Sequence, residues 1–319
     1  MKMRKKAVIA LGGNALGNNL EEQRTAVGYT AKTIVDLVAM EMDVIVTHGN
    51  GPQVGMIQRA MDGLALREPD CRPVTLPFSV AMSQGYIGID LQNAVKYELL
   101  CRGMDRKVST ILSQIEVDPQ DPAFEHPTKP IGRFMTEEEA QKLEQEGQLC
   151  REDAGRGWRI VVPSPEPMRI RELETIRTLV NAGHIVITCG GGGIPVVNEN
   201  GRLVGVSAVI DKDRTSSLLA EKLEADVLLI LTSVEKVAIN FGRKNQRWLD
   251  ILTVAEAKKY MEEGQFAKGS MLPKVEAAVS FAASGPGRET LITSLECAKD
   301  GMAGLTGTRI VGESAVPSG

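Results

Sequence analysis

Glycine clusters are the features of this sequence most suited to chemistry. Three of them each follow a short apolar run, and they read ALGGNAL (10–16), THGNGPQ (47–53) and TCGGGGIP (188–195). A glycine directly after a strand allows backbone N–H groups to turn toward a bound anion and approach it closely. A helix that starts after such a turn adds a partial positive charge at its N-terminus.

Two lysine-bearing segments accompany the glycine clusters. They read VIDKD (209–213) and SMLPKVEA (270–277). Together with the three glycine turns, these lysines predict a site that holds several negatively charged oxygen atoms. The site must be a local concentration of positive groups, because the whole chain has a formal net charge of −4.

The two best-known nucleotide-binding patterns do not fit these clusters. The pattern GxxxxGK[ST] nearly occurs at Gly264–Gly269, but Ser270 takes the position of the lysine. The dinucleotide pattern GxGxxG fails as well, because the clusters at 47–53 and 188–195 place Val54 and Pro195 where the third glycine belongs. A nicotinamide-dependent oxidoreductase is therefore disfavoured.

Alternating strand-like and helix-like segments must position these clusters. Apolar runs such as VLLIL (227–231) are typical of parallel strands that are covered on both faces. The alternation predicts an α/β sandwich with a mainly parallel sheet, whose ligands bind beyond the carboxyl ends of the strands. Strands are expected at 7–11, 43–47, 107–112, 184–189 and 226–232, and helices at about 27–41, 79–102, 168–182, 213–224 and 271–284.

Residues 116–163 differ in composition from the rest of the chain. The stretch is rich in proline near both ends, and Thr136 with Glu139 three residues later forms a capping box that opens a polar helix. We expect one domain over residues 1–319 with this stretch as an inserted subdomain. A lid that closes over the site and a merely solvated excursion remain equally open interpretations.

Composition narrows the class of protein. The chain has 319 residues, 43% of them hydrophobic and 24% charged, which is ordinary for a globular protein, and a block of basic residues that would suggest nucleic acid is lacking. No apolar stretch is long enough for a membrane span, and the run after the basic N-terminus is too short for a signal peptide. Five widely spaced cysteines without a CxxC pair favour a reducing compartment, so we expect a cytoplasmic protein.

Taken together, the segments resemble the carbamate kinase family of the amino-acid kinase superfamily. The resemblance extends from the first strand to ITSLE (292–296) and GT (307–308), and it is carried by ALGGNAL, THGNGPQVG, KPIG (129–132), CGGGGIPV, AVIDKD, LTSVEKVAIN and FAKGSMLPKVEAA. It implies a three-layer αβα sandwich with a mainly parallel central sheet and a small protruding subdomain. It also implies phosphoryl transfer between ATP and carbamate, giving ADP and carbamoyl phosphate.

The resemblance implies roles for four charged residues. Lys212 would contact the transferring phosphoryl oxygens, and Lys274 would stand on the phosphate side of the nucleotide. Lys129 would come down with the insertion onto carbamate and the γ-phosphate, and Asp213 would orient the lysines. Mg²⁺ would enter with ATP or ADP, held mostly by phosphate oxygens and water, so no dedicated protein metal site is expected.

Further residues are expected around the substrates. Backbone and amide groups that frame carbamate and the γ-phosphate are expected from Gly12, Gly13, Asn14, Gly49, Asn50 and Gly51, with Gly191 and Gly192 as the floor. The nucleoside pocket is expected to involve Thr232, Val234, Asn240 and Met271, of which Met271 fits the core equally well. His48 is interpreted as a residue that hydrogen-bonds a loop and Cys189 as a small buried residue, rather than as a base and a nucleophile.

Two alternative functions remain open at this stage. One is a kinase of the same superfamily that forms an acyl phosphate from another small carboxylate. The other is a nucleotide-binding protein without catalysis, which is disfavoured because all four charged site residues are present. A homodimer is expected from the resemblance, with the helix around 79–102 as part of the interface. The expected setting is the catabolism of nitrogen compounds such as arginine, used to make ATP.

Overall fold

A computed structural model describes residues 4–312, apart from 13–14, 18–19, 69 and 154. Its centre is an eight-stranded sheet whose neighbouring strands run parallel, apart from the antiparallel pair β16–β17. In spatial order the strands are β15 (Ile251–Thr253), β17 (Thr308–Val311), β16 (Glu289–Ser294), β12 (Val227–Thr232), β1 (Lys6–Leu11), β2 (Asp43–His48), β9 (Ile185–Ile187) and β3 (Val108–Thr110).

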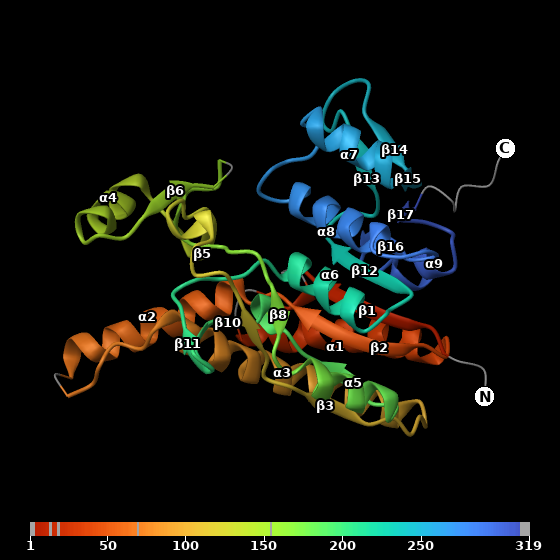
Figure 1. Cartoon of the computed structure of the whole chain (residues 1–319), viewed down its shortest axis with the longest axis horizontal. Helices are drawn as coiled ribbons and strands as arrows, with labels where there is room; N and C mark the ends of the chain where they lie inside the picture. The colour runs from red at the N-terminus through yellow and green to blue at the C-terminus, as the bar shows by residue number, and fades with distance from the viewer. Residues whose placement is uncertain (1–3, 13–14, 18–19, 69, 154, 313–319) are drawn as a thin grey trace.

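Helices cover both faces of this sheet (Figure 1). Along β1, Ala7, Ile9 and Leu11 join one buried apolar cluster, whereas Val8 and Ala10 join the other. The first cluster lies beneath α1 (Leu20–Ala39) and α3 (Leu76–Cys101), and the second beneath α6 (Lys212–Lys222) and α8 (Leu272–Ala283). The predicted three-layer αβα architecture with a mainly parallel sheet is therefore confirmed.

A second, four-stranded sheet lies beside the main one. Its order is β11 (Arg202–Gly205), β10 (Ile194–Glu199), β4 (Gln114–Glu116) and β8 (Arg169–Ile170). The stretch predicted as one strand at 107–112 thus ends early at Thr110, and the chain enters β4 of the other sheet. The helix predicted at 168–182 begins later, as α5 (Leu173–Asn181), because Arg169 and Ile170 pair with β4 instead.

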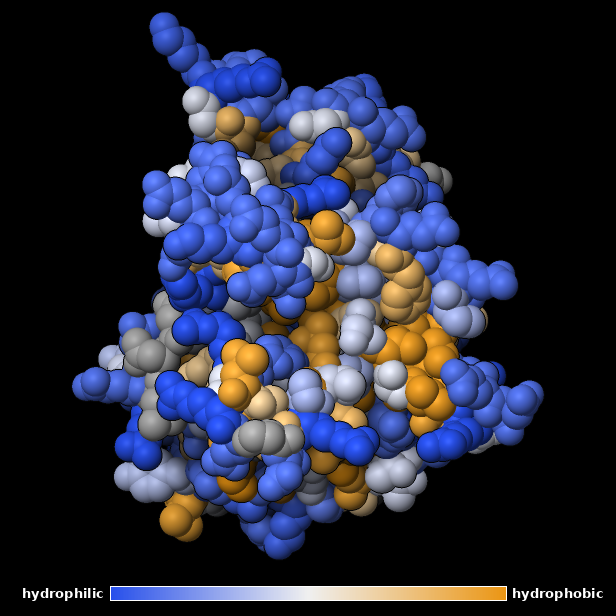
Figure 2. All heavy atoms as spheres, turned by 90° about the vertical axis from the view of Figure 1, so that its left-hand side faces the viewer, coloured by the Kyte–Doolittle hydropathy of each residue, from blue (hydrophilic) through white to orange (hydrophobic). Residues whose placement is uncertain are grey.

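The predicted insertion contains a small unit of its own. β5 (Lys129–Met135), β7 (Trp158–Val162) and β6 (Cys150–Glu152) form an antiparallel sheet, and α4 (Glu137–Gln145) packs on it. The capping box of Thr136 and Glu139 is present at the start of α4. This unit projects from the body beside α2 (Gly51–Arg67) (Figure 1), and the face that carries both shows apolar residues in its middle with hydrophilic residues around them (Figure 2).

The C-terminal third completes the molecule. A hairpin of β13 (Val237–Ile239) and β14 (Arg247–Leu249) precedes α7 (Val254–Glu262), which packs against α8, and α9 (Ala298–Met302) lies beside β16. No described helix is long and apolar enough to cross a membrane.

Candidate active site

The site is built around the start of α6, at the carboxyl end of the central strands. Asp211 is the N-cap of this helix, and its Oδ1 accepts hydrogen bonds from the backbone N–H of Asp213 (2.9 Å) and of Arg214 (3.3 Å). An aspartate before an N-terminal turn satisfies backbone donors that lack partners within the helix. The DKD sequence therefore fixes Lys212 and Asp213 in the first turn.

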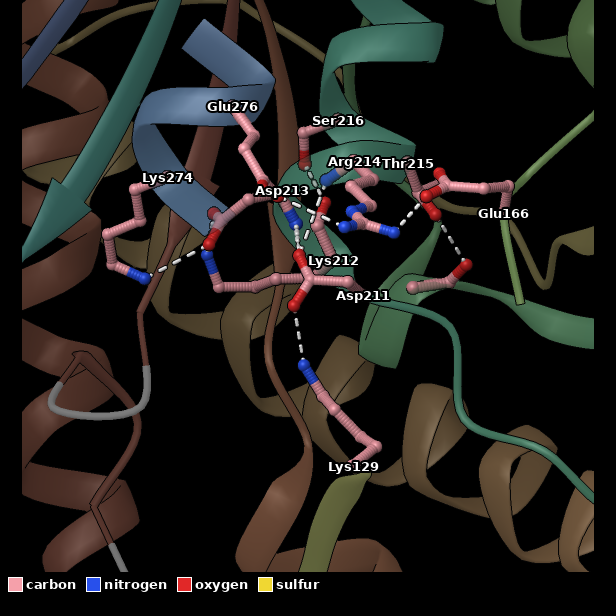
Figure 3. A network of polar contacts seen from close by, with 11 residues as sticks. Lys129, Glu166, Asp211, Lys212, Asp213, Arg214, Thr215, Ser216, Lys274 and Glu276 are labelled. Carbon is pink, nitrogen blue, oxygen red and sulfur yellow. Dashed lines mark hydrogen bonds and ion pairs between the residues drawn. The ribbon is translucent and has the colours of Figure 1, made fainter. Parts of the chain in front are cut away.

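Lys212 of this turn and two lysines from distant segments converge on its two aspartates (Figure 3). Asp213 accepts from the Nζ of Lys212, its neighbour in sequence, and from the Nζ of Lys274 on α8 at 3.0 Å. Lys129, the first residue of β5, places its Nζ 2.5 Å from Oδ2 of Asp211. The structure thus brings together all four charged residues that the sequence analysis selected, with Asp213 bridging two lysines. Their catalytic roles stay predictions.

Burial and mutual attraction set the charges of this network. Burial alone would raise the pKa of the Asp213 carboxyl, but Lys212 and Lys274 hold it below its usual value. Burial lowers the pKa of Lys212. The attraction of Asp213 opposes this shift, whereas the repulsion of Lys274 adds to it. For Lys274, the attraction of Asp213 outweighs burial and raises the pKa. Three cations against two carboxylates leave this network with surplus positive charge, as an anion site requires.

The first two glycine clusters extend the hydrogen bonding between strands of the central sheet. The backbone N–H of Gly12 donates to Leu231 O and that of Gly49 to Leu11 O, both at 3.1 Å. These two N–H groups are therefore engaged within the protein and are not free for an anion. Gly49 lies beneath the Lys212 side chain: a Cβ built there would be 3.7 Å from Cδ of Lys212, an ordinary van der Waals distance. Gly13 and Asn14 lie outside the described residues.

The third cluster packs tightly against the second. A Cβ on Gly191 would lie 2.1 Å from the side-chain nitrogen of Asn50, and Gly191 has a positive φ of 67°. A Cβ on Gly192 would lie 2.2 Å from Ile210 O, just before the DKD turn. These positions require glycine for close approach and for backbone conformation. Gly51 begins α2, with Pro52 in its first turn.

Buried polar residues of α3 hold these glycine loops in place. Ser83 Oγ accepts from the Asn50 side-chain amide at 2.9 Å. Gln84 donates to Gly190 O at 3.0 Å and accepts from the backbone N–H of Ser113 at 2.9 Å. Neither residue was predicted from the sequence. The available signal was a Ser-Gln pair within an otherwise apolar part of a helix.

His48 and Cys189 are structural residues, as the sequence analysis interpreted them. His48 is 1% exposed, its Nδ1 lies 2.8 Å from Gly49 O, and burial lowers its pKa to about 4. Cys189 is fully buried, which raises the pKa of its thiol to about 12. Neither group is suited to act as a base or a nucleophile near neutral pH.

A cavity of about 210 Å³ adjoins Lys274. Its walls include one predicted nucleoside residue, Thr232, and they are formed by Gly12, Ala15, Leu231, Thr232, Ser233, Lys274, Leu295 and Glu296. The other three residues predicted for the nucleoside pocket do not line this cavity. Met271 packs against the apolar core, Asn240 occupies the β13–β14 turn with a φ of 54°, and Val234 is partly buried.

The described residues contain no cluster of His, Cys, Asp or Glu arranged to hold a metal ion. The two carboxylates of the α6 turn, Asp211 and Asp213, already pair with lysines.

Comparison with known proteins agrees with this geometry. The model of the amino acid kinase family matches residues 5–294. The chain belongs to this family. It is 58% identical to the carbamate kinase-like protein YqeA of Escherichia coli, covering 97% of this chain and 99% of that protein. It is 50% identical to a carbamate kinase of Clostridium perfringens, over 96% and 99% of the two chains.

A solved structure shows the same fold. The carbamate kinase of Giardia lamblia bound to AMP-PNP superimposes with a TM-score of 0.89 at 42% identity, covering 98% of this chain and 100% of that one. The resemblance noted in the sequence is thereby confirmed, and this chain groups with carbamate kinases within its family.

Proposed function

We propose that this chain is an enzyme that transfers a phosphoryl group reversibly between ATP and carbamate, giving ADP and carbamoyl phosphate. The observation that carries the proposal is the convergence of Lys129, Lys212 and Lys274 on the buried α6 turn, beside the cavity that adjoins Lys274. Relatives that cover nearly the whole chain are named carbamate kinases.

Phosphoryl transfer to carbamate requires charge neutralisation rather than a general base. Carbamate is already an anion, and two like charges ~4 Å apart repel by about 4 kcal/mol at an effective dielectric near 20. In phosphoryl transfer, positioning and electrostatic stabilisation supply most of the catalysis. Lysines at the α6 turn meet this demand, and the neutral His48 is not needed. Mg²⁺ bound to the nucleotide would neutralise part of the phosphate charge.

Each lysine has a distinct proposed task. Lys212, with Gly49 beneath its side chain, would contact the transferring oxygens at the helix start. Lys274 would hold the nucleotide phosphates from the side of the cavity, and Asp213 would keep the two ammonium groups apart and aimed. Lys129 would hold carbamate from the insertion, which acts as a lid.

The wider setting also belongs to the proposal. We place the enzyme in the cytoplasm, where its five free thiols would stay reduced, making ATP from carbamoyl phosphate released in the catabolism of nitrogen compounds such as arginine. We also propose a homodimer. Its support is an exposed apolar stripe along one side of α3, formed by Phe78, Met82, Ile89, Tyr97 and Leu100.

A substrate panel tests the reaction class. ADP release is measured with MgATP and, in separate reactions, carbamate, acetate, aspartate and N-acetylglutamate. Release with carbamate alone supports the proposal. Release with another carboxylate would identify a different acyl-phosphate-forming kinase, and nucleotide binding without any release would indicate a catalytically silent protein.

A further inference from the structure

The insertion meets α2 through two glycines that touch backbone to backbone. A Cβ built on Gly55 of α2 would lie 2.3 Å from Cα and 2.6 Å from N of Gly132 in β5. Neither partner is a flexible side chain that could move aside. Apolar carbon atoms normally approach to about 3.5–4.0 Å, so any side chain at position 55 would displace β5 by about 1 Å or more.

The backbone of β5 is shaped for this crossing. Gly132 has a φ of 71°, a left-handed conformation that favours glycine. It lies in a bulge, because Ile131 pairs with Ile160 and Met135 with Trp158, so that three residues of β5 lie opposite Arg159 alone. Nη2 of Arg159 donates to Gly132 O at 3.0 Å and holds the bulge from the partner strand.

The same strand carries Lys129 to the site. Ile131, between the lysine and the glycine contact, packs with Val54 of α2 and with Val209, which precedes the Asp211 turn. Lys129 then reaches Asp211 at 2.5 Å. The glycine contact, the apolar contact and the ion pair thus follow one another within four residues of β5.

We infer that Gly55 and Gly132 are positioning residues, which seat β5 on α2 at the height that brings Lys129 to the α6 turn. This inference rests on the proposed function and explains why THGNGPQVG and KPIG each contain a glycine outside the site itself. A displacement of about 1 Å at a reacting group can cost about 10²-fold in rate. The contact between Gly55 and Gly132 therefore contributes to turnover by positioning Lys129.

The main variant is Gly55→Ala, and Gly63→Ala in the same helix is its matched control. Alanine is a better helix former than glycine, so both substitutions on their own favour α2. A Cβ at position 63 meets nothing within 4 Å. We expect Gly63→Ala to keep wild-type turnover and Gly55→Ala to lower kcat for ATP formation from carbamoyl phosphate by about 10²-fold, with the KM for ADP changed little.

A double-mutant cycle separates positioning from general damage. In a Lys129→Met background, Gly55→Ala should lower kcat by less than about twofold, because the group it displaces is gone. An equally large loss in both backgrounds would overturn the inference. If Gly55→Ala does not fold, Gly132→Ala replaces it in the cycle, because a Cβ there meets open space and only the backbone conformation is strained.

Chemical labelling gives a readout that does not need turnover. Acetylation of Lys129, followed by mass spectrometry, should be several-fold faster in Gly55→Ala than in the wild type and Gly63→Ala, with Lys258 on α7 as internal reference. Unchanged Lys129 labelling in Gly55→Ala would refute the inference. A wild type without carbamate kinase activity would instead refute the proposed function, and the labelling result would still decide the positioning.

Discussion

At the scale of residues, charge in the site resides on lysines and aspartates, while the His48 imidazole stays neutral. The histidine is buried next to Gly49 and Gly190, and a Cβ on Gly190 would lie 2.3 Å from its Nε2. Its pKa of about 4 lies well below the ordinary 6.5 because burial disfavours the imidazolium. The group therefore links stability to pH.

We expect His48 to destabilise the protein as the pH falls. Below 6.5 the unfolded chain binds a proton at this residue and the folded protein does not, until the pH approaches 4. The free energy of unfolding should drop by about 1.4 kcal/mol for each pH unit in this window, about 3 kcal/mol in total. Urea unfolding between pH 7.5 and 4.5 measures this slope.

Two variants isolate the contribution of the buried histidine. His48→Gln should show a shallower decline than the wild type, whereas His126→Gln, at an exposed position, should keep the full decline. Identical slopes for the wild type and His48→Gln would show that this histidine carries no such linkage.

Individual residues were predictable from sequence where a local motif specified them. Lys212 and Asp213 share one turn, so VIDKD was sufficient to place them together. The pair of Lys129 and Asp211 joins positions 82 residues apart, and its geometry depends on the crossing of β5 over α2. Ser83 and Gln84 were missed because their partners are backbone and side-chain groups of distant loops.

At the scale of elements, two helices begin with the same capping box. Thr136 starts α4 in the insertion, and Thr253 starts α7 in the body; each accepts from the N–H three residues on, where a glutamate caps in return. Of these two helices, only α4 belongs to the insertion, which is the proposed lid. Matching substitutions at the two caps therefore probe local stability in and outside the insertion.

Thr136→Ala should destabilise α4 by about 1 kcal/mol through the loss of a backbone hydrogen-bond partner. Amide hydrogen exchange in α4 should then be about fivefold faster, with exchange in β12 unchanged, since 1.4 kcal/mol corresponds to a factor of ten. Thr253→Ala is the matched control and should affect α7 instead. Faster exchange throughout the sheet in Thr136→Ala would contradict independent opening of the insertion.

The central strands β1, β2, β9 and β12 and the helices α1, α3, α6 and α8 were predictable because their apolar patterns are strong, whereas α2 and the strand β16 were not predicted. Within α2 the buried residues are confined to Gln53, Val54 and Gly55 in its N-terminal part. A helix that projects into solvent has no periodic apolar stripe for sequence analysis to detect. Its start was interpreted only as an anion-binding turn, which left its support of β5 unrecognised.

At the scale of the whole molecule, the apolar stripe on α3 is the structural reason to expect self-association. Its residues recur at helical spacing on one side, and Tyr97 and Leu100 are 68% and 77% exposed. Ser83 and Gln84, which are buried in the same helix, hold the glycine loops. A dimer formed through α3 would therefore stabilise the helix that holds the glycine loops of the site.

Ile89→Lys should convert the proposed dimer into a monomer, because it places a charge in the centre of the stripe. Light scattering after size-exclusion chromatography should give twice the 34.5 kDa chain mass for the wild type and a single chain mass for the variant. Leu305→Lys, at a residue 75% exposed beyond α9, is the control and should stay dimeric. A monomeric wild type at micromolar concentration would refute the homodimer.

The overall architecture followed from the sequence because buried parallel strands and glycine turns have distinctive patterns. The course of the insertion did not follow, since its small sheet is held by contacts that only the folded chain creates. The proposed function places phosphoryl transfer at the lysine-lined α6 turn.

The most direct test measures ATP formation from carbamoyl phosphate and MgADP by luminescence, in the wild type, Lys212→Ala and Lys222→Ala. Lys222 lies at the exposed end of the same helix and is the matched control. We predict rapid ATP formation by the wild type and Lys222→Ala, with turnover reduced by about 10²–10³-fold or more in a folded Lys212→Ala. Near wild-type turnover in Lys212→Ala, or no ATP above the spontaneous background in the wild type, would contradict the account.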